Sequence, residues 1–120
     1  MNLDISKLAI PKHFDIEESG SSIRINDEGD GYTMYVSTFP TNDSIACINN
    51  VQDIESVEKF KTLFDIAERI VDESDFTSAV ITVNDYFEHV NEIEARGYVL
   101  MVKGRNPHSD NDISFFVKKL

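Results

Sequence analysis

The pattern of apolar residues between Ser44 and Leu120 constrains the fold of this chain more than any other feature. It predicts a strand, a long helix, a second strand, a short helix that ends at Arg96-Gly97-Tyr98, and two further strands. Alternation of strands with helices is typical of a mixed α/β layer architecture. The pattern therefore predicts an α/β (α+β) domain.

The long helix is predicted over residues 56–73, because apolar side chains recur there at spacings of three and four. Either Asp53 or Ser56 could cap its start. Residues 76–83 are nearly all apolar or β-branched, which predicts a strand covered on both faces. A second helix is predicted to begin at Asn84-Asp85, with Glu88 placed as in a capping box, and to end at Gly97.

The first half of the chain is predicted to consist of an entry segment followed by strands. Residues 1–22 predict an irregular or short helical entry that ends in a turn at Ser19-Gly20-Ser21-Ser22. Residues 23–25 and 32–39 predict the two strands of a hairpin, and residues 44–49 predict a third strand. A length of 120 residues with 41% hydrophobic residues predicts one domain over residues 1–120.

Charge limits the classes of partner. The chain has 22 acidic and 11 basic residues, a net charge of -11, and the acids gather on the two predicted helices. Phosphates would be repelled, so we expect neither direct nucleic-acid binding nor binding to anionic membranes. One interpretation of the charge is a solvated surface. The other is an acidic surface that docks on a basic partner or imitates DNA.

Cysteine and histidine usage predicts no metal site. The single cysteine, Cys47, excludes an internal disulfide and a cysteine-based zinc cluster. His13, His89 and His108 lie far apart, and none has a carboxylate at metal-ligand spacing. No apolar run is long enough to cross a bilayer and the N-terminus lacks a secretory signal pattern, so we expect a cytoplasmic protein.

Two segments carry a resemblance to a known family. Asn84…Glu92-Ile93-Glu94-Ala95-Arg96-Gly97-Tyr98 resembles the Asn…Leu-Tyr-Glu-Lys-x-Gly-Phe segment of the GNAT acetyltransferase superfamily, and Ser114–Leu120 resembles its closing strand. The resemblance covers Ile23–Leu120. It implies the order β-β-β-α-β-α-β-β, with a mixed, mostly antiparallel central sheet of about six strands and two main helices, and it implies acetyl transfer from acetyl-CoA.

The segment before the long helix departs from that family. A Gln/Arg-x-x-Gly-x-Gly/Ala loop there holds the pyrophosphate of coenzyme A, but here Glu55 stands for the first glycine and Val57 for the second small residue. A like charge at ~4 Å costs about 4 kcal/mol at a surface-like dielectric, whereas a helix end offers only ~0.3–1 kcal/mol. Repulsion from Asp53, Glu55 and Glu58 therefore dominates unless these acids point away.

Two further departures concern catalysis and the acceptor. Ile93 falls where the family often has a tyrosine that protonates the leaving thiolate, and isoleucine has no proton to give. The two early helices that cover the acceptor site in the family do not fit into residues 1–22. The sequence therefore assigns no catalytic residue.

Two hypotheses follow. In the first, this is an acidic GNAT-fold protein that has lost acetyl-CoA chemistry, takes no cofactor and binds a basic protein surface, for instance as a phage-type inhibitor or a DNA mimic. Its contact residues would be Asp53, Glu55, Glu58, Asp65, Glu68, Asp72 and Glu73. Because the sheet has edge strands, a homodimer is a further expectation.

In the second hypothesis the chain is an acetyl-CoA-dependent N-acyltransferase that acts on an amine of a small molecule or a protein. The cofactor-binding residues would then be Asn49, Val51, Gln52, Ser56 and Asn84.

Overall fold

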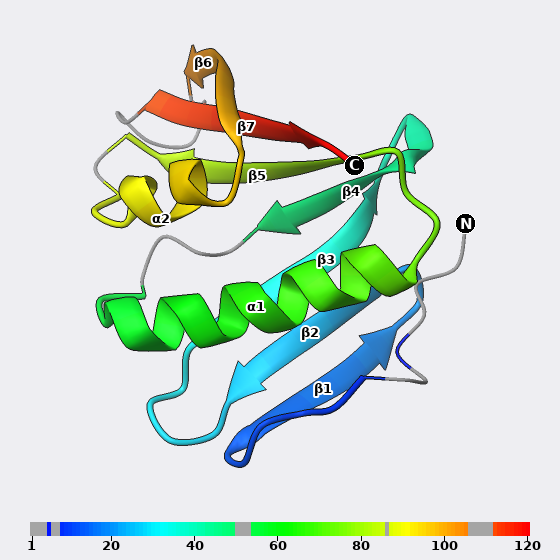
Figure 1. Ribbon diagram of the computed structural model, residues 1–120, viewed down its shortest axis with the longest axis vertical. Coiled ribbons are helices and arrows are strands. Elements are labelled where there is room, and N and C mark those ends of the chain that lie inside the picture. The colour runs from blue at the N-terminus through cyan, green and yellow to red at the C-terminus, as the bar shows by residue number, and fades with distance from the viewer. Residues whose placement is uncertain (1–4, 6–7, 50–53, 86, 106–111) are drawn as a thin grey trace.

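The computed structural model describes residues 5, 8–49, 54–85, 87–105 and 112–120. This part of the chain forms seven strands and two helices (Figure 1). The strands are β1 (Phe14–Ser19), β2 (Ser22–Asp27), β3 (Thr33–Phe39), β4 (Asn42–Asn49), β5 (Ser78–Asn84), β6 (Val99–Arg105) and β7 (Asp112–Lys119), and the helices are α1 (Val57–Glu73) and α2 (Val90–Ala95).

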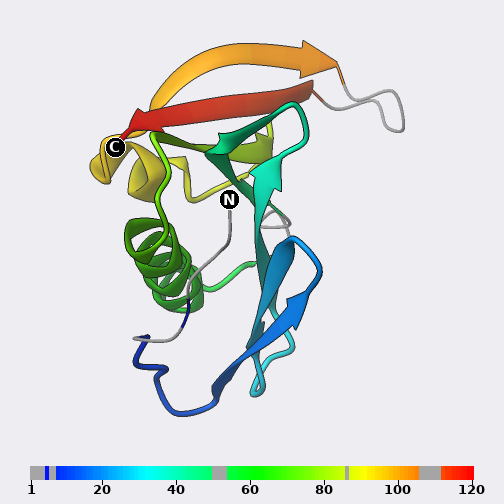
Figure 2. The same ribbon diagram turned by 90° about the vertical axis from the view of Figure 1, so that its right-hand side faces the viewer.

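All seven strands belong to one sheet, in the order β1-β2-β3-β4-β5-β7-β6. Neighbours are antiparallel except β4 and β5, which are parallel because the chain crosses over through α1. Turned by 90°, the molecule shows α1 and α2 on the same side of the sheet (Figure 2). The mixed, mostly antiparallel sheet with two main helices is thus confirmed, with seven strands in place of about six.

The additional strand is β1, in the segment where an irregular or short helical entry was expected. Phe14 and Ile16 alternate with acidic residues, which is the period of a strand with one face on the core. Gly20 has a φ of 58°, which a tight turn between two strands requires, so β1 folds straight back on β2. The excess of acids in this short segment hid the alternation.

The second helix is shorter than the sequence predicted. It begins at Val90 rather than at Asn84-Asp85, and its N-cap residue is His89, whose side chain makes no capping hydrogen bond. Asp85 instead follows β5, and its amide donates to the carbonyl of Asp112 at 3.0 Å. The backbone between β5 and α2 is therefore used to align β5 with β7 rather than to extend the helix.

The long helix matches its prediction closely. Ser56 is the N-cap, and its hydroxyl accepts from the Lys59 amide at 3.3 Å. Most of the predicted apolar stripe is buried against the helix-facing side of the sheet, where Ile25, Met34, Val36 and Ile48 are fully buried, but its first residue, Val57, is 37% exposed. The buried residues of α1, which include Ile66 outside the predicted stripe, are Phe60, Leu63, Phe64, Ile66, Ala67, Ile70 and Val71. One amphipathic helix therefore supplies most of the non-sheet core.

A buried ion pair fixes the start of α1 to the turn between β2 and β3. The Asp27 carboxylate is fully buried and accepts from Lys59 Nζ at 3.0 Å and from the amides of Gly29 and Asp30 at 3.1 and 3.3 Å. Lys59 Nζ also lies 3.7 Å from Asp30 and 5.3 Å from the centre of the Phe14 ring. This cluster joins α1, β1 and the β2–β3 turn.

The same contacts set the ionisation of Asp27. Burial on its own would raise the pKa of this carboxyl, but the hydrogen bonds from Lys59 and from the two turn amides outweigh burial and hold the pKa below its usual value. The folded-state pKa is thus lower than the unfolded one. The resulting stabilisation is present above ~3.9, the unfolded value, and is lost as the pH falls through the folded-state pKa.

We predict that Asp27→Asn lowers the free energy of unfolding at neutral pH by about 2 kcal/mol, because it removes the charge from a buried hydrogen-bonded pair. Urea unfolding measures this. Asp30→Asn is the matched control, since Asp30 is exposed and its contact with Lys59 is long, and it should cost well under half as much. The difference in unfolding free energy between wild type and Asp27→Asn should shrink as the pH falls below ~3.9. A gap that does not change with pH would contradict this account.

Candidate functional site

The parallel strands β4 and β5 separate before they end. Their register runs from Ile45↔Ser78 to Ile48↔Ile81 and stops there. Beyond that point β4 continues to Asn49, which pairs with Tyr35 of β3, and β5 continues to Asn84, which pairs with Ile113 of β7. We call this opening, from Asn49 on one strand and Thr82 on the other, the β4/β5 fork.

The start of α1 lies at the same end of the sheet as the fork. The chain leaves β4 at Asn49 and enters α1 through Ile54, Glu55 and Ser56, next to the segment that follows β5. Among hydrogen bonds between described residues, the amides of Phe60 and Lys59 are satisfied by the carbonyl and hydroxyl of Ser56. The amides of the first turn form the positive end of a 17-residue helix, which favours an anion.

A buried histidine holds this entry segment in place. His89 Nε2 lies 2.9 Å from the carbonyl oxygen of Ile54 and 3.0 Å from that of Glu55. Because both partners are acceptors, Nε2 carries the hydrogen. The ring stacks on Phe60 at 5.6 Å between centroids and meets Phe87 edge-on at 5.3 Å. His89 thus ties the entry of α1 to the entry of α2 and fixes one wall of the fork.

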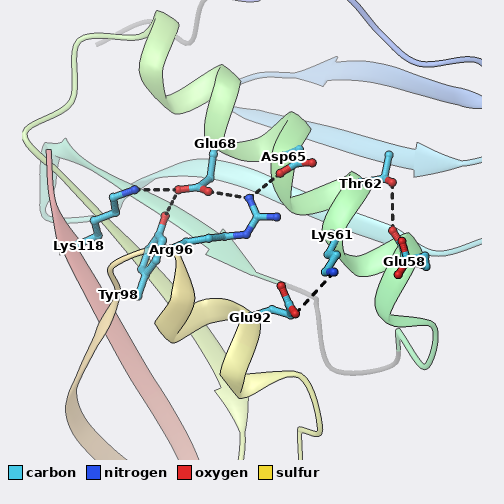
Figure 3. A network of polar contacts seen from close by, with 9 residues as sticks. All are labelled: Glu58, Lys61, Thr62, Asp65, Glu68, Glu92, Arg96, Tyr98 and Lys118. Atoms are coloured by element: carbon cyan, nitrogen blue, oxygen red, sulfur yellow. Dashed lines mark hydrogen bonds and ion pairs between the residues drawn. The ribbon is translucent and has the colours of Figure 1, made fainter.

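A charged cluster on the helix side holds α1 to the C-terminal strands (Figure 3). Arg96 Nη1 lies 2.6 Å from Asp65 Oδ1 and 2.9 Å from Glu68 Oε1, and its guanidinium stacks 4.7 Å from the Phe64 ring centre. Glu68 Oε2 also accepts from Lys118 Nζ at 3.3 Å and from the Tyr98 hydroxyl at 3.4 Å. Glu68 is therefore shared by three partners from two segments, the connection between α2 and β6 and the strand β7.

The tyrosines near Ile93 in the sequence, Tyr86 and Tyr98, are the residues that could replace the missing proton donor. Burial, and then the charge of Glu68, raise the pKa of Tyr98, so its hydroxyl stays protonated and faces α1 rather than the fork. Ile93 is fully buried in the core. Neither residue supplies an acid at the fork, and Tyr86 lies outside the described residues.

The predicted cofactor residues come together only in part. Asn49 and Asn84 lie at the fork and Ser56 caps α1, as just described. Val51 and Gln52 lie outside the described residues. Cys47 lies on β4 as expected, and burial raises the pKa of its thiol, which disfavours a nucleophilic role.

The predicted partner-binding acids fall into two groups. Glu55, Glu58, Asp72 and Glu73 are exposed, whereas Glu68 is mostly buried inside the charged cluster, where Asp65 also contributes although it is largely exposed. Asp53 lies outside the described residues. Among the residues that the structure describes, no group of acids, histidines or cysteines could hold a metal ion. No helix in that same part is long and apolar enough to cross a membrane.

The residue that sequence reasoning underrated is His89. The sequence excluded it as a metal ligand but gave no sign of its hydrogen bonds to two carbonyls 34 and 35 residues away. A histidine close to Phe87 and Val90, shortly after a buried strand, indicates only weakly that its ring is buried and hydrogen-bonded. Only the position of the α1 entry segment gives it a role.

No protein-family model matches the chain, and no curated protein matches it significantly. Solved structures do. The N-terminal domain of a ribosomal-protein-alanine acetyltransferase from Clostridium acetobutylicum is 13% identical, with a TM-score of 0.64 over 91% of this chain and 92% of that one. Ard1 from Thermoplasma volcanium is 16% identical, with a TM-score of 0.62 over 83% and 70%.

A third match is RimL, an α-N-protein acetyltransferase of a ribosomal protein, in complex with coenzyme A. It is 11% identical, with a TM-score of 0.57 over 82% of this chain and 61% of that one. The chain therefore has the fold of the GNAT acetyltransferases, as the sequence resemblance implied. At these identities the likeness concerns the fold alone.

We predict that His89→Phe loosens the entry of α1, because it keeps an aromatic ring but leaves two carbonyls without their donor. The expected loss of unfolding free energy is about 1–3 kcal/mol. Hydrogen exchange should accelerate at the amides of residues 54–58 more than in the middle of α1. His89→Gln, which can return a donor, should recover part of the stability. Equal exchange at both places in His89→Phe would argue against the clamp.

Proposed function

We propose that the chain binds an acyl-coenzyme A at the β4/β5 fork and transfers the acyl group to an amine. The observation that carries this proposal is the fork itself, where two parallel strands part in front of the N-terminus of α1. Among the described residues, Asn49 follows Ile48 in β4 without a register partner in β5, and a strand edge of this kind can offer backbone donors and acceptors to a linear amide-containing arm. The fold match to a protein solved with coenzyme A supports the same assignment.

The acids near α1 oppose cofactor binding less than their number suggests. Glu55 and Glu58 are both exposed. Exposed carboxylates can turn away from a bound phosphate and are screened by salt, so their repulsion falls below the about 4 kcal/mol of two like charges held ~4 Å apart at a surface-like dielectric. The positive end of α1 then offsets much of the remaining repulsion, since it is worth ~0.3–1 kcal/mol per charge. The entry segment lacks glycine, so phosphates would meet its side chains more closely than in a glycine-rich loop.

Each part of the fork would have a separate role in binding and transfer. Acyl-coenzyme A, when bound, supplies an activated thioester. Asn49 and the β4 edge orient the arm, the first turn of α1 attracts the phosphates, and His89 keeps that turn in register with β5. We assign no base among the described residues at the fork, so water would carry the proton of the acceptor amine to the thiolate that leaves when the amide bond forms and the C–S bond breaks.

A second candidate is the protein-contact function, in which acetyl-CoA chemistry is lost. It is favoured by the exposed acids of α1 and by the glycine-free entry segment. Glu58, Asp65 and Asp72 follow one another at seven-residue intervals, about 10 Å along the helix. A DNA duplex carries one charge per ~1.7 Å, so this row is far sparser than a DNA mimic requires. The second candidate function therefore predicts a protein with a basic surface as the partner.

We predict that acetyl-CoA stabilises the protein by about 3 kcal/mol at a hundredfold excess over its Kd, measured by thermal shift and calorimetry. Glu55→Gln should bind coenzyme A about threefold more tightly, because it removes one screened negative charge next to the phosphates. Glu73→Gln is the matched control, since Glu73 is equally acidic and exposed but lies at the opposite end of α1. It should leave the affinity unchanged.

Acceptor amines are then tested by thiol release. Binding without release with any of a panel of amino acids, peptides and polyamines would leave a coenzyme A-binding protein without the proposed transfer. If acetyl-CoA does not bind and no thiol is released, the first proposal is overturned and the second is favoured.

A further inference from the structure

The edge strand β6 exposes a continuous run of apolar side chains. Val99, Leu100, Met101 and Val102 are 61, 43, 66 and 54% exposed. β6 lies at one end of the sheet and pairs only with β7 among the described strands. The run therefore combines an apolar surface with the open backbone edge of a sheet. We call these four residues the β6 apolar edge.

The opposite edge of the same sheet is built differently. β1 is six residues long, and its exposed residues include Glu17 and Glu18. Charged side chains on an edge strand hinder pairing with another chain. In β6 no charge interrupts residues 99–102, and its basic residues, Lys103 and Arg105, come only at the end. One edge is protected and the other is open.

Side chains of the β6 apolar edge lie on both faces of the sheet. Val99 and Val102 pair with Val117 and Phe115, and Leu100 pairs with Phe116, which lies in the core on the helix side. The register shifts between Leu100 and Val102, so Met101 is the extra residue of a bulge and has the greatest exposure of the four. No single layer of this chain could cover all four, because they flank the edge.

We propose that the β6 apolar edge pairs with the same edge of a second copy of this chain, antiparallel and with Met101 near the two-fold axis. Such an interface is isologous, so one strand supplies both halves. This inference is independent of acyl transfer, because it uses neither the fork nor the entry of α1.

Charge favours a second copy over another occupant. Glu94 of α2 is exposed and lies five residues before Val99, and the base between them, Arg96, is already paired with Asp65 and Glu68. The bases Lys103 and Arg105 end β6. Antiparallel pairing of two identical strands brings the basic end of each towards the end of β6 that follows Glu94 in the other. Parallel pairing would place like charges together, which is unfavourable. β6 is also free of acids in a chain of net charge -11, which lowers the repulsion between two copies at this edge.

The test is the association state of the full chain over a range of concentrations, followed by analytical ultracentrifugation. Wild type should form a dimer. Met101→Lys should raise the dissociation constant about tenfold or more, because it buries two like charges at the axis. Ile10→Lys is the matched control, since Ile10 is an exposed apolar residue on another part of the molecule and the charge change is the same. It should leave the dimer intact.

A second measurement locates the axis, in a Cys47→Ser background. Met101→Cys should form an intermolecular disulfide on mild oxidation, because residues directly opposite in antiparallel strands lie about 5 Å apart between Cα atoms, within disulfide reach. Lys103→Cys should not, because two copies of residue 103 would be offset by four residues, about 13 Å along the strands.

A wild type that stays monomeric at every concentration would overturn the proposal, whether or not β6 captures some other protein. A dimer that Met101→Lys leaves unchanged, or one that cross-links through residue 103 and not 101, would overturn it as well. Far-UV circular dichroism of each variant checks that the monomer is folded.

Discussion

The burial of one face of α1 against the sheet is the interaction on which the rest of this structure depends. Its apolar stripe packs on the helix-facing side of the sheet, and its polar side carries ion pairs to other parts of the fold. Lys59 joins it to the β2–β3 turn, and Glu68 joins it to the connection between α2 and β6 and to β7. The crossover through α1 makes β4 and β5 parallel, and the fork begins where their pairing ends, after Ile48 and Ile81.

Much of this could be predicted from sequence, because it follows from periodicity. The stripe of α1, its Ser56 cap and the buried strand β5 are regular patterns set by local spacing, and all three are as expected. β1 was missed because Phe14 and Ile16 are only two apolar residues in an acidic segment. The late start of α2 was missed because Asp85 and Glu88 have the spacing of a cap, whereas the contacts of β5 with β7 decide the backbone there.

The candidate site was predictable in outline and not in detail. The positions of Asn49 and Asn84 at the fork and of Ser56 at the start of α1 follow from the order of elements, which fixes which ends of strands and helices meet. Their role in binding a cofactor stays a prediction. Which acids form internal ion pairs was not predictable, since nothing in the sequence distinguishes Asp27 and Glu68 from the other carboxylates in a chain of net charge -11. Both are neutralised internally by lysine and arginine, which leaves a smaller set of acids, Glu55, Glu58, Asp72 and Glu73 among them, facing solvent.

The first four strands bear on the order in which the chain folds. β1 to β4 form a meander, joined by short turns, in which every strand pairs with the next one in sequence. Such contacts close short loops and form quickly. β5 instead joins β4 across the whole of α1 and joins β7 from Ser78 to Lys119, 41 residues away by number. We expect the meander and α1 to form first, and the C-terminal strands to dock on this platform afterwards, so that the fork is the last part of the fold to take shape.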